Sequence, residues 1–88
     1  MITRVVMPPL GETMDEGTIA RWVKGVGDTV ERGDILLEVE SDKAVLEVES
    51  FGRGILRKIV AEAGETVPIR KLIAVIADED DDISGVTE

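Results

Sequence analysis

Lys43 is the residue of this chain whose type and setting best fit a chemical role. It stands between Asp42 and Ala44 in ESDKAVLEV, residues 40–48, a stretch that is otherwise acidic and aliphatic. A lysine that forms a Schiff base needs a desolvated or cationic environment, which lowers the pKa of its amine. A neighbouring aspartate such as Asp42 instead favours the charged amine. We therefore expect Lys43 to stay a charged amine that another enzyme modifies.

The amino-acid composition excludes most other kinds of catalytic site. The 88 residues include no Cys and no His, so the chain supplies no thiolate nucleophile, no imidazole base and no zinc site of the usual ligands. A chain of this length forms one domain with a small core and little room for a buried cleft. We expect that the isolated domain is not an enzyme, and that any thiol chemistry comes from an attached group.

The formal net charge of −9 narrows the choice of partners. It disfavours nucleic acids, whose phosphates require basic surface, and it disfavours anionic lipid. No apolar run approaches the roughly 20 residues of a membrane span, and ITRVVM at residues 2–7 does not read as a signal or transit peptide. We expect basic protein partners, no nucleic acid, no membrane, and a cytoplasmic location, or the mitochondrial matrix if the source is eukaryotic.

Short strands are the elements that must position Lys43. The apolar residues occur in β-branched runs bounded by Gly, Pro and acidic turns, and no long helical pattern is present. Pro8 and Pro9 end the first run because proline donates no hydrogen bond to a sheet. The pattern predicts strands over 2–7, 18–23, 35–41, 44–50, 55–60 and 73–77, with shorter extended pieces near 29–30 and 66–67.

An internal repeat organises these strands. GTIARWVKGVGDTV from residue 17 matches GILRKIVAEAGETV from residue 54, an offset of 37 residues. Two such copies predict an all-β fold of two sheets related by a pseudo-twofold axis, closed into a sandwich or flattened β-barrel. Gly27 and Gly64 would occupy equivalent turns with positive φ. Trp22 aligns with Ile59 and is expected in the core, whereas Lys43 aligns with Asp80 and is not part of the shared architecture.

A hairpin around Lys43 would have a register that separates its apolar residues from its acidic ones. If Asp42 and Lys43 form a two-residue turn, alternation puts the apolar pairs on one face and most acids on the other. Lys43 would then stand at the tip as a rigid post for a flexible arm, although an exposed lysine that only aids solubility remains an alternative. The facing pairs would be Val39 with Leu46, Leu37 with Val48, Glu40 with Val45, and Glu38 with Glu47.

At these residues the chain resembles a known family. ESDKAVLEVES, residues 40–50, looks like the lipoyl-attachment hairpin of lipoyl domains from dihydrolipoyl acyltransferases of 2-oxo acid dehydrogenase complexes, and residues 7–30 are similar to the first half of those domains. The resemblance extends from about Ile2 to Asp78. It implies lipoate joined through an amide to Lys43, and a flattened barrel of two four-stranded antiparallel sheets.

The resemblance also implies a function and its partners. A thiamine-diphosphate-dependent 2-oxo acid dehydrogenase would reductively acylate the lipoyl group. MDEGTIARW at residues 14–22 favours a pyruvate-type complex or a related acetoin-type complex. The acyltransferase core would transfer the acyl group to coenzyme A, and dihydrolipoyl dehydrogenase would reoxidise the dithiol. A lipoate ligase or lipoyl transferase would load the domain. Partner recognition is assigned to Asp42 and Ala44, and to Glu12 and Thr13 in the loop before the first repeat.

Two alternative functions stay open, and the sequence also predicts where the domain ends. Biotinyl domains present a lysine in the same way but typically between two Met residues, so a biotin carrier is one alternative, and a cofactor-free β-barrel interaction module is the other. Residues 1–79 are predicted to form the lipoyl domain. Residues 80–88 are predicted to begin an acidic flexible linker, because they are polar and show no patterned apolar face.

Overall fold

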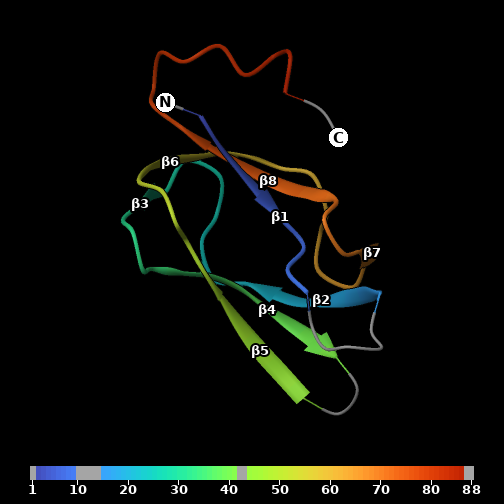
Figure 1. Cartoon of the computed structure of the whole chain (residues 1–88). Helices are drawn as coiled ribbons and strands as arrows, with labels where there is room; N and C mark the ends of the chain where they lie inside the picture. The colour runs from blue at the N-terminus through green and yellow to red at the C-terminus, as the bar shows by residue number, and fades with distance from the viewer. Residues whose placement is uncertain (1, 10–14, 42–43, 87–88) are drawn as a thin grey trace.

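The computed structural model describes residues 2–9, 15–41 and 44–86, which form eight strands and no helix. Figure 1 shows the strands as two layers. One sheet has the order β1-β8-β6-β3 and the other β5-β4-β2-β7, and every strand pair is antiparallel. The strands are β1 (Thr3–Val6), β2 (Glu16–Trp22), β3 (Thr29–Val30), β4 (Ile35–Ser41), β5 (Ala44–Glu49), β6 (Gly54–Ile59), β7 (Thr66–Pro68) and β8 (Leu72–Ala77).

This architecture confirms the predicted all-β fold of two four-stranded antiparallel sheets. All six predicted strands and both shorter pieces are present, with ends that differ by one or two residues. β2 begins earlier than predicted, at Glu16, because Glu16 and Gly17 pair with Pro68 and Val67 of β7. Sequence alternation gives no sign of this additional pairing, since Glu16 is exposed and Gly17 has no side chain.

The internal repeat is visible in the strand pairing. Trp22 of β2 faces Leu37 of β4, and 37 residues later Ile59 of β6 faces Ala74 of β8. The register shifts at the same place in both copies, between residues 19 and 21 and between residues 56 and 58. The two sheets are therefore built on one pattern, as the pseudo-twofold predicts.

The turns of the two copies bind each other's strands. Gly27 and Gly64 have φ values of 97° and 94°, a region that favours glycine. The Gly27 amide donates to the Leu56 carbonyl at 2.8 Å, and the Gly64 amide donates to the Ile19 carbonyl at 2.7 Å. Each half is thus closed by a turn from the other half, and main-chain hydrogen bonds join the two copies.

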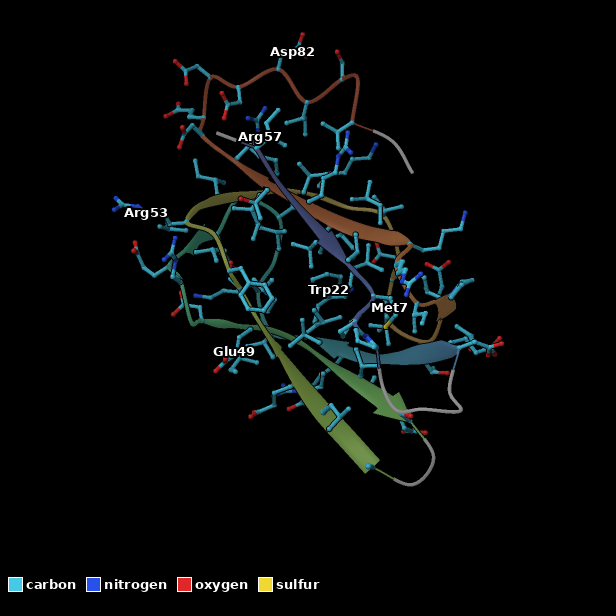
Figure 2. The ribbon with its side chains drawn as sticks, in the orientation of Figure 1. Met7, Trp22, Glu49, Arg53, Arg57 and Asp82 are labelled. Atoms are coloured by element: carbon cyan, nitrogen blue, oxygen red, sulfur yellow. The ribbon has the colours of Figure 1, made fainter. Side chains whose placement is uncertain are left out.

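The core lies between the two sheets. Trp22 packs against it while only partly buried, and its indole N–H donates to the Ala61 carbonyl at 2.8 Å, which confirms the predicted core role and satisfies the polar end of the ring. Figure 2 shows Trp22 and Met7 between the layers. Full burial of one leucine, isoleucine, valine or methionine side chain stabilises the fold by about 1.5–3 kcal/mol. The fully buried large side chains are Met7, Ile19, Val30, Leu36, Leu37, Val39, Leu56, Ile73, Val75 and Ile76.

The segment after β8 contributes an apolar contact that the sequence analysis did not predict. Val86 is buried and, with Ile83, packs against Leu72 and Val75 of β8. The Ile83 carbonyl accepts a hydrogen bond from the Val86 amide at 3.0 Å, and this turn brings the two side chains to one side. Figure 1 shows the segment arching over the sheet at the end of the molecule away from β5. The expectation that residues beyond 79 offer no apolar face is therefore wrong, and the start of a flexible linker stays a prediction.

Candidate functional site

The β4–β5 hairpin has the register that the sequence predicts. Val39 faces Leu46, Leu37 faces Val48, and pairing continues to Ser41, the last residue of β4, and Ala44, the first residue of β5. Only Asp42 and Lys43 connect these two paired residues, and both lie outside the described residues. The described strands therefore fix the two ends of a two-residue connection.

The two faces of the hairpin differ in burial. Leu37 and Val39 of β4 are fully buried in the core. Their partners on β5 are less covered than the sequence predicts, because Val48 is half-buried and Leu46 is 41% exposed. β5 is the outer strand of its sheet, and Figure 1 shows it projecting beyond the strands of the other layer. The hairpin is thus anchored in the core through β4, while β5 borders solvent.

A shift in the ladder explains another departure from simple alternation. Leu36 and Leu37 are consecutive in sequence, yet both are fully buried. The β4–β5 register shifts between Ile35 and Leu37, and such a bulge gives one strand an additional residue. Both leucines can therefore enter the core and strengthen the base of the hairpin.

The other face of the hairpin is acidic. Glu38 and Glu47 face each other across the two strands, and like charges in directly opposed positions are destabilising. Arg21 of β2 offsets this, because its Nε donates to Glu38 Oε1 at 3.0 Å. The hydrogen bond with Glu38 is the main cause that raises the Arg21 pKa, followed by the charge of Glu38 and then that of Glu47. Glu40, nearer the hairpin tip, is exposed.

The start of β2, which follows the loop predicted to take part in recognition, lies beside the hairpin. Thr18 of β2 pairs with Glu40 of β4, so the start of β2 lies next to the end of β4. The Asp15 carbonyl accepts a hydrogen bond from the Ile69 amide at 2.9 Å, which fixes the chain just before β2. Residues 10–14, which include the predicted Glu12 and Thr13, lie outside the described residues.

Of the predicted site residues, the structure therefore places Ala44 alone, as the exposed first residue of β5. Sequence reasoning missed Arg21. Its position opposite Glu38 follows from the β2–β4 pairing and from the register shift between Ile19 and Arg21. Alternation of residues along β2 gives no signal for that shift, although the opposite charges could have suggested a cross-strand pair.

The described parts of the chain contain neither a metal site of acidic side chains nor a membrane-spanning helix. Residues 2–9, 15–41 and 44–86 contain no group of three or more acidic side chains placed to hold a metal ion. Over the same ranges no helix is long and apolar enough to cross a membrane.

Known proteins match the chain over most of its length. A family model for biotin and lipoyl attachment, described as "Biotin-requiring enzyme", matches residues 3–76. The chain belongs to the biotin/lipoyl-attachment family. A solved structure of this fold, the lipoyl domain of the 2-oxoglutarate dehydrogenase complex from Azotobacter vinelandii, superposes with a TM-score of 0.71 at 31% identity, covering 85% of this chain and 95% of that one.

Relatives in the family are longer proteins. The dihydrolipoyllysine-residue acetyltransferase component of the pyruvate dehydrogenase complex is 43% identical in Rickettsia bellii, over 100% of this chain and 21% of the relative. In Zymomonas mobilis it is 46% identical, over 98% of this chain and 20% of the relative. The chain thus spans about a fifth of the length of these relatives. The resemblance to lipoyl domains of dihydrolipoyl acyltransferases is confirmed.

Proposed function

We propose that this chain is a covalent lipoyl carrier, which shuttles acyl groups and reducing equivalents between the active sites of a pyruvate-type 2-oxo acid dehydrogenase complex. The observation that carries the proposal is the pairing of Ser41 with Ala44, which leaves only Asp42 and Lys43 to connect two strands. A lysine in a two-residue connection stands at the end of the hairpin, within reach of other enzymes. The names of the relatives support the choice of lipoate and of the pyruvate-type complex.

The residues of the hairpin suit this role in two ways. Leu37 and Val39 anchor β4 in the core, so the strand that leads to the attachment point is held in place. Glu40 and Glu47 are exposed on the strands that lead to the hairpin end. Acidic surroundings suit modification of an amine by a dedicated enzyme better than Schiff-base chemistry by the chain itself, which needs a desolvated or cationic environment.

The attached group would supply chemistry that the sequence lacks. Lipoate joined by an amide to Lys43 provides a dithiolane that accepts two electrons and an acyl group, whereas the chain has no Cys. The isolated domain then needs no catalytic residue of its own. Its hairpin positions the arm, and the adjacent surface selects which enzyme receives it, since tethering alone raises effective concentration without conferring specificity.

The partners follow from this function. They are a thiamine-diphosphate-dependent 2-oxo acid dehydrogenase, the acyltransferase core, dihydrolipoyl dehydrogenase, and a lipoate ligase or lipoyl transferase. We assign recognition to Asp42 and Ala44 at the hairpin, and to Glu12 and Thr13 in the loop attached beside it. The location would be the cytoplasm, or the mitochondrial matrix if the source is eukaryotic; the name of a relative from Arabidopsis thaliana includes "mitochondrial".

Intact-mass measurement after enzymatic loading tests the proposal against its alternatives. The chain is incubated with lipoate ligase, ATP and lipoate, and in parallel with biotin ligase, ATP and biotin. We expect the mass of one lipoyl group on the wild type and on Lys58→Ala, whose lysine is exposed on β6, and none on Lys43→Ala. Addition of biotin alone would favour a biotin carrier, and addition of neither would favour a cofactor-free interaction module.

A further inference from the structure

A groove runs along the side of the molecule where the two sheets expose their edges. β1 is the edge of one sheet and β5 is the edge of the other. Two adjoining hollows share Pro8, Pro9, Val48, Glu49 and Phe51 in their walls, so they form one continuous groove between these strands. We call it the β1–β5 groove. It is separate from the hairpin tip and was not predicted from the sequence.

The groove gathers apolar side chains that solvent can reach. Phe51, the one phenylalanine in the sequence, is 86% exposed, and Leu46 and Val6 are each 41% exposed. All three line the groove. Single exposed apolar residues are ordinary, but a contiguous patch rimmed by polar groups marks interaction sites on soluble proteins. A ligand with apolar side chains would therefore cover this patch.

The turn after β5 holds Phe51 in its exposed position. On one side Ser50 is buried, with its amide donating to the Asp34 carbonyl and its carbonyl accepting from the Gly33 amide, both at 2.8 Å. On the other side, a Cβ on Gly52 would lie 2.3 Å from the Thr3 hydroxyl oxygen, so the backbone here is pressed against β1. These contacts order the backbone on both sides of Phe51, so the direction in which its side chain leaves the chain is set before binding. A backbone that is ordered before binding loses little entropy on binding.

The edge of β5 offers main-chain hydrogen bonds along the same groove. β5 pairs with β4 on one side, and in the parts of the chain that the structure describes no strand pairs with its other side. Every second residue of such an edge directs its N–H and C=O outward. An extended peptide can therefore pair with β5 as an additional strand.

The charges on the edge decide which peptide fits. Glu47 and Glu49 are exposed on β5, and Figure 2 shows Glu49 pointing away from the barrel. A second copy of the chain, paired edge to edge, would set glutamates against glutamates, which is unfavourable. Basic residues would meet complementary charge. Arg4 lines the groove from β1, so the basic residues of the ligand belong on the glutamate side.

We propose that the β1–β5 groove binds an extended segment of a partner protein in which aliphatic and basic residues alternate. The segment adds to β5 as a strand. Because successive side chains of a strand point to opposite faces, its aliphatic residues contact Leu46, Val48 and Phe51 while its basic residues face Glu47 and Glu49. The proposal does not depend on lipoate, since it uses no atom of Lys43.

Titration by nuclear magnetic resonance tests this proposal. The ¹⁵N-labelled chain is titrated with an acetylated, amidated eight-residue peptide of alternating valine and lysine, and with the same peptide carrying glutamate for lysine. We expect saturable shifts of the amides of residues 46–49 and 51 with the lysine peptide alone. Phe51→Ala should weaken binding about fivefold or more, as for a buried aromatic anchor. Changing Glu47 and Glu49 together to Gln should weaken it about threefold to fivefold.

Two variants outside the groove serve as matched controls. Val26→Ala removes an apolar side chain that is 62% exposed elsewhere, and Glu62→Gln removes an exposed carboxylate from another turn; both should bind the lysine peptide as the wild type does. The proposal is overturned if no saturable shift occurs at β5, if the glutamate peptide binds as tightly, or if Phe51→Ala binds normally. Concentration-dependent shifts at β5 without peptide would instead assign the groove to a second copy.

Discussion

Substituting aspartate for valine at two positions of the hairpin tests how it is anchored. Val39 is fully buried on β4, whereas Val45 is 57% exposed on the adjacent strand. Val39→Asp places a carboxylate in the core without a partner, which costs several kcal/mol in addition to about 1.5–3 kcal/mol of lost burial. Val45→Asp puts the same group in water, so the change should lie within about 0.5 kcal/mol.

Two milder substitutions, Val39→Ala and Val45→Ala, still give a free energy of unfolding if Val39→Asp fails to fold. Val39→Ala removes two buried methyl groups, which should cost about 2 kcal/mol at roughly 0.8 kcal/mol per group plus a small cavity. Val45→Ala should again change little. Unfolding in urea can be followed by the fluorescence of Trp22, the single tryptophan, which packs against the core. The slope against urea reports whether unfolding stays two-state.

Acid conditions provide an independent check on Val39→Asp. Burial raises the pKa of a carboxyl group in the folded state above its unfolded value. The cost is then largest above the raised folded-state pKa, and it decreases as the pH falls from there towards the unfolded value, about 3.9 for aspartate, because protonation removes the buried charge. Equal stability of Val39→Asp and Val45→Asp, or a larger loss for Val45→Asp, would refute the assignment of the two faces.

Three other predictions concern the tip, the turns and the C-terminal segment. Exchanging Asp42 and Lys43 should leave stability unchanged but slow lipoylation strongly, and equal rates measured by intact mass would contradict a position-specific attachment. Gly27→Ala and Gly64→Ala should each cost about 1–2 kcal/mol in urea unfolding because both turns have positive φ, and clearly unequal costs would argue against equivalent turns. Val86→Ala should lower the free energy of unfolding by about 1–2 kcal/mol, because this side chain packs on β8; an unchanged value would mean that the segment is not docked in solution.

The sequence predicts the strands and the hairpin register because these depend on local rules. Alternation within residues 35–50 allows one register about a two-residue connection, and the repeat supplies the second sheet from the first. The shared register shift between the copies shows that the 37-residue offset reflects a real structural equivalence. Where the pattern is local or repeated, the sequence therefore predicts individual cross-strand residue pairs.

Features that depend on contacts between distant segments could not be predicted in this way. Leu46 has the alternation of a core residue, yet β5 is an edge and leaves it 41% exposed. Val86 lies in a polar stretch, and only the position of β8 beneath it makes it buried. Phe51 would be assigned to a core by its type, but the fixed backbone at Ser50 and Gly52 keeps it outside. Each outcome is set by what packs nearby in space.

The most direct test of the carrier function is acetyl transfer onto the loaded domain. The lipoylated chain is incubated with a thiamine-diphosphate-dependent pyruvate dehydrogenase and pyruvate, then digested and mapped by mass spectrometry. We predict one acetyl group on the lipoylated peptide that contains Lys43, and none on the unloaded chain or on Lys43→Ala. Lipoyl or acetyl groups on Lys24, Lys58 or Lys71 instead, or no acetylation of the loaded wild type, would contradict the account.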